Sequence, residues 1–135
     1  MQPLVSLSPD GMHNAVLEYR SEIRFGPAHY SLMIDEIHFG ERAFGNSFLW
    51  SPDSRFFAIQ EWGTVSEGSG PQTRLLLIDL DRQQECILSR AEKGFIVPKS
   101  FENNKLIYAK KYHMPPRTRE FEIEFLSLSR WENLK

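Results

Sequence analysis

Two carboxylates at matching places in the chain are the strongest candidates for chemistry. Glu18 directly precedes Tyr19, and Glu61 directly precedes Trp62, each at the end of an apolar segment. A pair of carboxylates is the minimal equipment for glycoside hydrolysis, because one acts as the acid and the other as base or nucleophile. The matching position in a third segment is Lys111, which suits an ion pair between neighbouring segments equally well. A hydrolase that uses Glu18 and Glu61 is therefore an alternative hypothesis rather than the leading one.

The other polar residues carry no signature of a metal, nucleophile or phosphate site. Segment 45–49 begins like a nucleophile elbow, but Leu49 stands where the second glycine is required. Segment 68–70 lacks the Gly-Lys-Ser/Thr ending of a P-loop, and segment 79–83 begins like a calcium loop and then departs from it at Gln83. Four histidines lack the paired spacing of zinc ligands: His13, His29, His38 and His113. We predict no catalytic residue, no bound metal and no cofactor.

Composition and charge limit the classes of partner. The chain has 135 residues, 41% of them hydrophobic, which predicts a single domain over residues 1–135. Lys plus Arg number 16 against 18 Asp plus Glu, without a basic block, so we expect neither nucleic acid nor a membrane as partner. The start of the chain lacks the features of a signal peptide, and Cys86 is the only cysteine. A reducing, cytoplasmic location is the expectation.

A repeated turn must position the candidate residues. Ser8-Pro9-Asp10-Gly11 and Ser51-Pro52-Asp53-Ser54 are offset by 43 residues, and each precedes an apolar segment. Further along, segment 32–35 matches segment 76–79 at an offset of 44, and a fainter third copy starts at Phe101. Proline presets φ in such a turn, and Asp and Gly tolerate the conformations that follow. The pattern predicts three antiparallel β-meander units, approximately 3–44, 45–92 and 93–135, and hence an all-β fold.

The second unit should form the centre of the core. Residues 56–59 read Phe-Phe-Ala-Ile, so apolar side chains occupy both faces of the expected strand. Such a strand is typically covered on both sides. Segment 119–128 alternates apolar and Glu residues, which favours a half-buried strand over a helix. We expect five side chains to be largely buried: Trp50, Phe57, Ile59, Leu76 and Ile78.

The stretch "WSPDSRFFAIQEW", followed by "LLLIDLDR", resembles the TolB-type β-propeller repeat, a relative of the WD repeats. The resemblance covers nearly the whole chain as three units and is clearest in the second. In the third, Glu102-Asn103-Asn104 replaces Pro-Asp-Gly. It implies propeller-blade-like meanders and transfers no catalytic residue. Propellers close with about 4 to 8 blades, so three units predict an open curved sheet stack or a sandwich. A homodimer that completes a ring is the alternative to a monomer.

The leading functional hypothesis is a non-catalytic protein-binding module. A small, mildly acidic chain without catalytic equipment fits the profile of bacterial immunity proteins, which block a partner toxin; this is an analogy of class, not of residues. Stacked repeats place equivalent loops on one face, here 20–29, 63–72 and 113–119. Arginine and aromatic residues commonly anchor interfaces, and Trp62 is expected to be half exposed where its strand ends. The predicted partner-binding residues are Arg24, Phe25, Trp62, Glu67 and Arg117.

Overall fold

Antiparallel strands make up nearly all of the regular structure. A computed structural model describes residues 2–22, 28–64, 71–113 and 115–134. Within these ranges there are twelve strands and no helix, so the all-β prediction is confirmed. The strands are β1 (Leu4–Leu7), β2 (Asn14–Glu22), β3 (Ala28–Ile34), β4 (Ile37–His38), β5 (Ala43–Trp50), β6 (Phe56–Thr64), β7 (Gln72–Asp79), β8 (Gln84–Glu92), β9 (Gly94–Glu102), β10 (Lys105–His113), β11 (Pro116–Glu124) and β12 (Glu132–Asn133).

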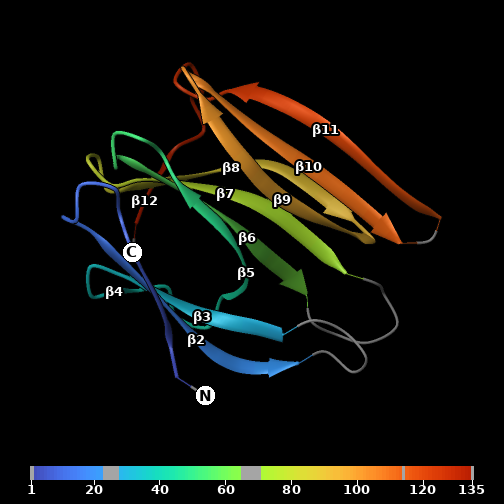
Figure 1. The fold of residues 1–135 in the computed structure, drawn as a ribbon, viewed down its shortest axis with the longest axis horizontal. Coiled ribbons are helices and arrows are strands. Elements are labelled where there is room, and N and C mark those ends of the chain that lie inside the picture. The colour runs from blue at the N-terminus through green and yellow to red at the C-terminus, as the bar shows by residue number, and fades with distance from the viewer. Residues whose placement is uncertain (1, 23–27, 65–70, 114, 135) are drawn as a thin grey trace.

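The strands form an open stack of three layers. The larger sheet has the order β1-β2-β3-β5-β6-β7-β8-β12, with β4 beside β3, and the smaller one has the order β11-β10-β9. Strands β3 and β5 meet only at the pair Tyr30 and Phe44, and the large sheet turns there from a first layer (β1–β4) into a middle layer (β5–β8). Strands β9–β11 form the third layer (Figure 1). The sheets do not close into a barrel or a propeller, as predicted for three units.

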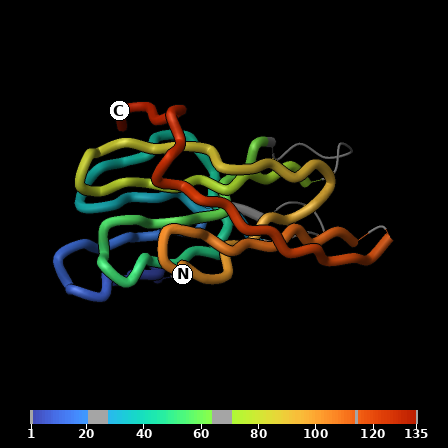
Figure 2. Tube along the Cα trace, turned by 90° about the horizontal axis from the view of Figure 1, so that it is seen from above, coloured from blue at the N-terminus to red at the C-terminus, as the bar shows by residue number. Residues whose placement is uncertain are grey.

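The C-terminal segment crosses back over the stack. After β11 it leaves the third layer and returns to the middle layer (Figure 2). There β12 pairs antiparallel with the start of β8, through Glu132 with Glu85 and Asn133 with Gln84. The tail thus covers only the first two residues of the outer edge of β8.

The middle layer has a hydrophobic core on each of its faces. Side chains alternate between the two faces of a strand, so Phe57 and Ile59 of β6 enter the core shared with the first layer, and Phe56 and Ala58 enter the other core. Four of the five residues predicted to be buried are fully inaccessible: Phe57, Ile59, Leu76 and Ile78.

Trp50, the fifth of these residues, is partly buried and packs against the edge of the core. Its strand ends beside the first turn, at the rim of the core. The indole ring packs on Phe57 at a centroid distance of 4.6 Å, and its Nε1–H donates to Ser6 Oγ at 3.0 Å. The polar edge of the ring therefore reaches the first layer instead of the interior of the core.

The two Ser-Pro-Asp turns have the same internal hydrogen bonds. Ser8 Oγ donates to the carboxylate of Asp10 at 2.7 Å, and Ser51 Oγ donates to that of Asp53 at 2.5 Å. Each serine oxygen also accepts the backbone N–H five residues later, at 3.0 and 2.9 Å. The sequence repeat is therefore also a repeat of local geometry in these two turns.

The fourth position of each turn adopts the left-handed conformation, with φ of +73° at Gly11 and +64° at Ser54. Ser54 Oγ also accepts the backbone N–H of Asp10 at 3.0 Å, so the two turns contact each other. The third copy differs. There Asn103 has a φ of +57° between the paired residues Glu102 and Lys105, which gives a tighter two-residue turn.

Candidate functional site

The predicted partner-binding residues fall into three groups. Arg24, Phe25 and Glu67 lie outside the described residues. Arg117 is exposed at the start of β11, where its guanidinium lies 4.6 Å from the centre of the Tyr112 ring. That contact holds the charge at the surface near the end of the β10–β11 hairpin. The role of Arg117 in binding stays a prediction.

Trp62 is buried, so the expectation of a half-exposed anchor was wrong. Only 4% of the residue is accessible. Its ring packs edge-on against Phe95 of β9 at a centroid distance of 5.5 Å, and its Nε1–H donates to Gln60 Oε1 at 3.0 Å. The third layer covers this end of β6. A covering segment that starts more than thirty residues later gives no signal in the local sequence around Trp62.

Glu61 lies at the centre of a cluster of four charged side chains. Arg42 donates to both of its carboxylate oxygens, at 2.8 and 2.9 Å, and Arg74 adds a hydrogen bond of 2.9 Å. Arg42 also binds Glu85, at 2.6 Å. The Glu61 side chain is only 1% exposed. Because removing one partner of a buried pair leaves an uncompensated charge, this cluster supports the structure strongly.

The electrostatics of Glu61 are wrong for a general acid. Burial alone would raise the pKa of its carboxyl, but hydrogen bonds and charge from Arg42 and Arg74 outweigh burial, and the pKa is lowered. A hydrolytic pair needs one carboxyl that keeps its proton near neutral pH. Glu18 does not supply the second carboxyl of such a pair, because its side chain does not face the core that lies between β2 and β6. It is exposed and follows Leu17, whose side chain enters the core, so Glu18 is directed to the opposite face of β2.

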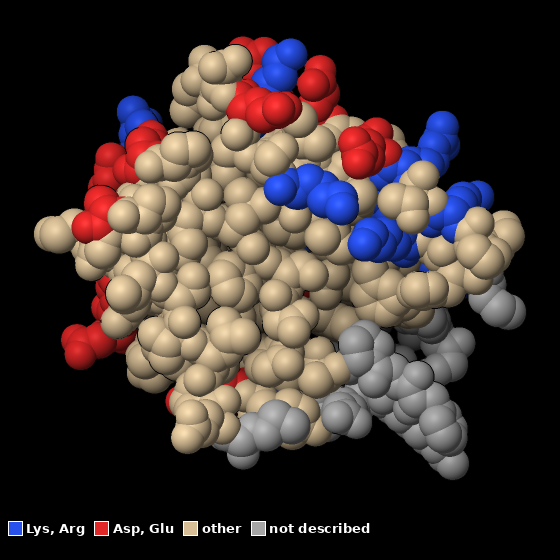
Figure 3. Space-filling model, viewed as in Figure 1, with Lys and Arg blue, Asp and Glu red and all other residues tan. Residues whose placement is uncertain are grey.

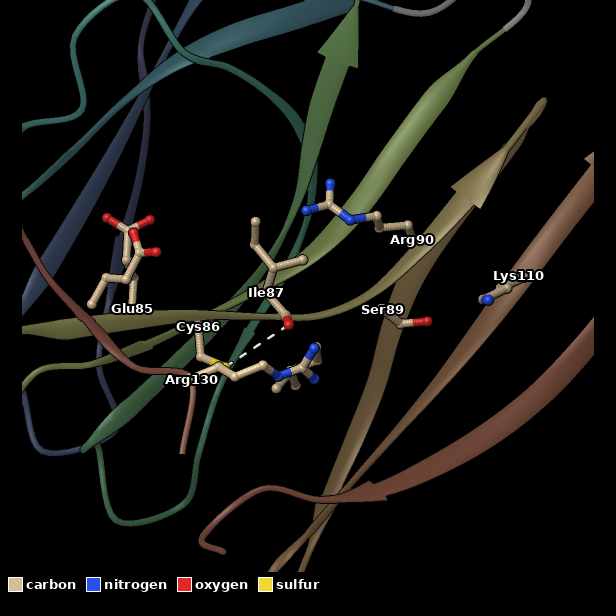
Figure 4. A pocket seen from close by; sticks show the side chains of 9 residues that line it. Glu85, Cys86, Ile87, Ser89, Arg90, Lys110 and Arg130 are labelled. Carbon is tan, nitrogen blue, oxygen red and sulfur yellow. Dashed lines mark hydrogen bonds between the residues drawn. The ribbon is translucent and has the colours of Figure 1, made fainter. Parts of the chain in front are cut away.

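A basic groove runs along the outer edge of β8. It has a volume of about 480 Å³. Three cations from separate parts of the chain line it: Arg90 of β8, Lys110 of β10 and Arg130 of the C-terminal segment (Figure 4). The space-filling view shows most Lys and Arg side chains at the upper right of the molecule, whereas the centre of the face shown carries almost no charge (Figure 3).

The groove cations have no acidic partner among the described residues. No carboxylate oxygen in this part of the chain lies within 4.0 Å of Arg90, Lys110 or Arg130. Lys110 Nζ lies 5.1 Å from the centre of the Phe121 ring, and the cross-strand partner of Lys110 on β11 is another cation, Arg119. These charges are therefore available to an anionic ligand.

Sequence reasoning missed this groove. Its cations are separated by about twenty residues, with Arg90 in the second unit and Lys110 and Arg130 in the third, so no spacing in the sequence brings them together. Only the stacking of the layers and the return of the C-terminal segment do so. A search for basic blocks along the chain has no means of detecting such a site.

The described residues hold no group of three or more His, Cys, Asp and Glu side chains placed to bind a metal ion. The same part of the chain has no helix of the length and apolar character needed to cross a membrane. No family model, curated protein or solved structure matches this chain.

Proposed function

We propose that this chain is a non-catalytic protein-binding module. One observation carries the proposal: β2, β6, β8 and β10 all end at the same side of the stack (Figure 1), and two of the cations that line the basic groove belong to β8 and β10. Arg90 lies two residues before the end of β8, and Lys110 lies three residues before the end of β10. Together with Arg117 at the start of β11, they form a cationic surface near the ends of β8 and β10.

This surface has the composition of an interface. Arginine is enriched in protein interfaces, and hairpin ends on a rigid sheet scaffold are common binding sites. Glu61, the buried member of the candidate catalytic pair, accepts hydrogen bonds from two arginines. These features favour binding over hydrolysis.

An immunity-type inhibitor, which blocks a partner toxin, is the form of this function that we favour. It rests on the analogy of size, charge and cytoplasmic expectation, not on a residue match. A cationic surface would suit the acidic active site or an acidic exposed segment of such a toxin. The expected genetic observation is a toxin gene immediately upstream.

The test is formation of a complex with a defined stoichiometry. The tagged chain is used to isolate a partner from its native host, and the purified pair is examined by light scattering, with one-to-one binding expected. Arg117→Ala combined with Arg119→Ala should weaken the complex about tenfold or more, in line with the loss of interface arginines. Lys105→Ala is the matched control, because Lys105 lies at the opposite end of β10.

The contrary outcome is equally concrete. If no protein forms a stable complex and a hydrolase screen finds turnover that Glu61→Gln abolishes in a folded variant, the chain is an enzyme. Self-association is the remaining alternative, and a doubled mass in light scattering would reveal it.

A further inference from the structure

We infer that the outer edge of β8 binds an extended acidic segment of a partner as an added β-strand. The inference rests on the proposed function, because it assumes a protein partner, and it specifies the chemistry of the segment recognised. The groove along β8, with Arg90, Lys110 and Arg130 around it, is the binding site.

The edge of β8 is free over most of its length. β8 has nine residues, and β7 pairs with its inner edge from one end to the other, apart from a bulge at Leu88. In the described structure the outer edge is paired only at Gln84 and Glu85, by β12. From Cys86 to Glu92 no described strand covers it. A row of free backbone N–H and C=O groups is a template for another strand.

The pairing with β12 shows that this edge accepts an antiparallel strand. β12 contributes only two residues, and the segment before it turns away from the edge to pack Trp131 against Phe56. An incoming strand that begins where β12 leaves the edge would extend the same row of pairs along segment 87–91.

The cations are distributed on both faces of the edge. Arg90 is in register with Arg74, so it lies on the face that bears the Glu61 cluster. Lys110 and Arg130 lie on the opposite face and flank Ser89 (Figure 4). Because successive side chains of a strand point to opposite faces, an added strand rich in acidic residues would present carboxylates to both groups.

The charge at the start of the groove does not oppose such a strand. Glu85 is a partly buried acid in the lining, and Arg42 already binds it at 2.6 Å. Among the described residues that line the groove, the unpaired charge is therefore positive apart from that of Glu132, which lies in β12 at the end of the paired region. Charge complementarity favours an acidic segment over a basic or an apolar one.

Edge cations have a second known use. Lysine and arginine at a free edge, together with a bulge, prevent pairing with other chains. This protective role predicts that no strand binds, so a peptide experiment separates the two roles.

The probe is a capped peptide of about ten residues, a typical strand length or slightly more, in which Glu-Glu pairs alternate with Thr-Thr pairs so that carboxylates lie on both faces of the strand. Binding to the full chain is measured by fluorescence anisotropy at low salt. We expect saturable binding, no binding of the matching Lys-Thr peptide, and at least tenfold weaker binding to an Arg90→Glu, Lys110→Glu variant. The milder Arg90→Gln, Lys110→Gln variant, checked by its melting curve, keeps the test valid if charge reversal impairs folding. Lys105→Glu should leave the affinity unchanged.

Two further measurements address backbone pairing. Amide hydrogen exchange should slow in segment 87–91 when the peptide binds, and a Glu-Thr peptide with a central proline should bind at least tenfold less tightly, because proline removes a backbone donor.

Absence of binding, or equal binding of the proline peptide without protection of β8, overturns the inference. If a purified partner binds the chain while both peptide criteria fail, the protein-binding proposal stands and this site is wrong. If no partner forms a complex, the proposed function itself fails.

Discussion

Glu61 ties the connection between the first and middle layers, through Arg42, and β7, through Arg74, to β6 by charge rather than by apolar contact. We predict that Glu61→Gln lowers the free energy of unfolding by about 3–5 kcal/mol at neutral pH, because Arg42 and Arg74 lose the charge that compensates theirs. Urea unfolding measures the change. Glu41→Gln is the matched control: Glu41 pairs with Arg20 but is 98% exposed, so its loss should cost less than about 1 kcal/mol. Equal effects of the two variants would contradict the structural role of the cluster.

The same carboxyl predicts how stability depends on pH. Burial acts to raise the pKa of Glu61 and of Asp79, but hydrogen bonds from arginines outweigh it, and both pKa values lie below the ordinary 4.5 and 3.8. A carboxyl with a lowered folded-state pKa stabilises the fold above its ordinary pKa, and this contribution is lost as the pH falls through the lowered value.

The free energy of unfolding should therefore decline as the pH drops below about 4.5, with a shallower decline in Glu61→Gln. Chemical unfolding at a series of pH values measures both slopes. Parallel curves for the two proteins would show that Glu61 does not contribute to the acid transition.

Phe57 tests the contribution of the apolar core between the first and middle layers. Its ring is fully inaccessible and packs on Phe48 and Trp50 at centroid distances of 5.4 and 4.6 Å. Phe57→Ala should cost about 3–5 kcal/mol, the usual range for a buried aromatic. Val5→Ala, at a residue that is 60% exposed, should change stability by less than about 0.5 kcal/mol. Thermal unfolding compares them, and a small shift for Phe57→Ala would contradict its central position.

At the scale of elements, the β3–β4 turn has a backbone conformation that its residue types do not favour. Asp35 and Glu36 have φ of +49° and +69° between the paired residues Ile34 and Ile37, so both turn residues are left-handed. Such turns favour glycine at the second position. Glu36→Gly should therefore stabilise the protein by about 1 kcal/mol, because it removes the strain of a side chain at positive φ.

Gly40 supplies the opposite control for that prediction. Its φ is +63°, and an added Cβ would have no neighbour within 4 Å. Gly40→Ala should therefore destabilise through the backbone alone, by about 1 kcal/mol. Thermal unfolding should give shifts of opposite sign for Glu36→Gly and Gly40→Ala. Shifts of the same sign would indicate that the positive φ angles do not govern either residue.

The elements that sequence reasoning predicted well are those defined by local chemistry. The two Ser-Pro-Asp turns specify their own hydrogen bonds, and the apolar pairs of residues 56–59 specify a strand buried on both faces. The half-buried strand expected at 119–128 is present as β11, but it ends at Glu124. Trp62 was misjudged and the β8 groove was missed because both depend on which distant segments stack against them.

At the scale of the whole molecule, the outward face of the third layer opposes further stacking. Phe121 and Ile123 of β11 pack against the second core, so Glu120, Glu122 and Glu124 project to the other side, where they are exposed. Covering this row would desolvate carboxylates. We therefore predict a monomer of 15.8 kDa by light scattering at micromolar concentration. A doubled mass would support the ring-completing dimer instead.

The contact between the two turns has a consequence for how such a chain can change in length. Ser54, in the turn of the second unit, accepts the N–H of Asp10 in the turn of the unit before it. The Ser-Pro-Asp turn that marks the second unit in the sequence therefore also supplies a hydrogen bond to the preceding unit. A tandem duplication of residues 45–92 would copy this hydrogen-bonding turn together with the strands that it aligns. Insertion of a whole unit would therefore bring its own hydrogen bond to the preceding turn. Insertion of part of a unit would separate the turn from the strands that it aligns, and this hydrogen bond would be lost.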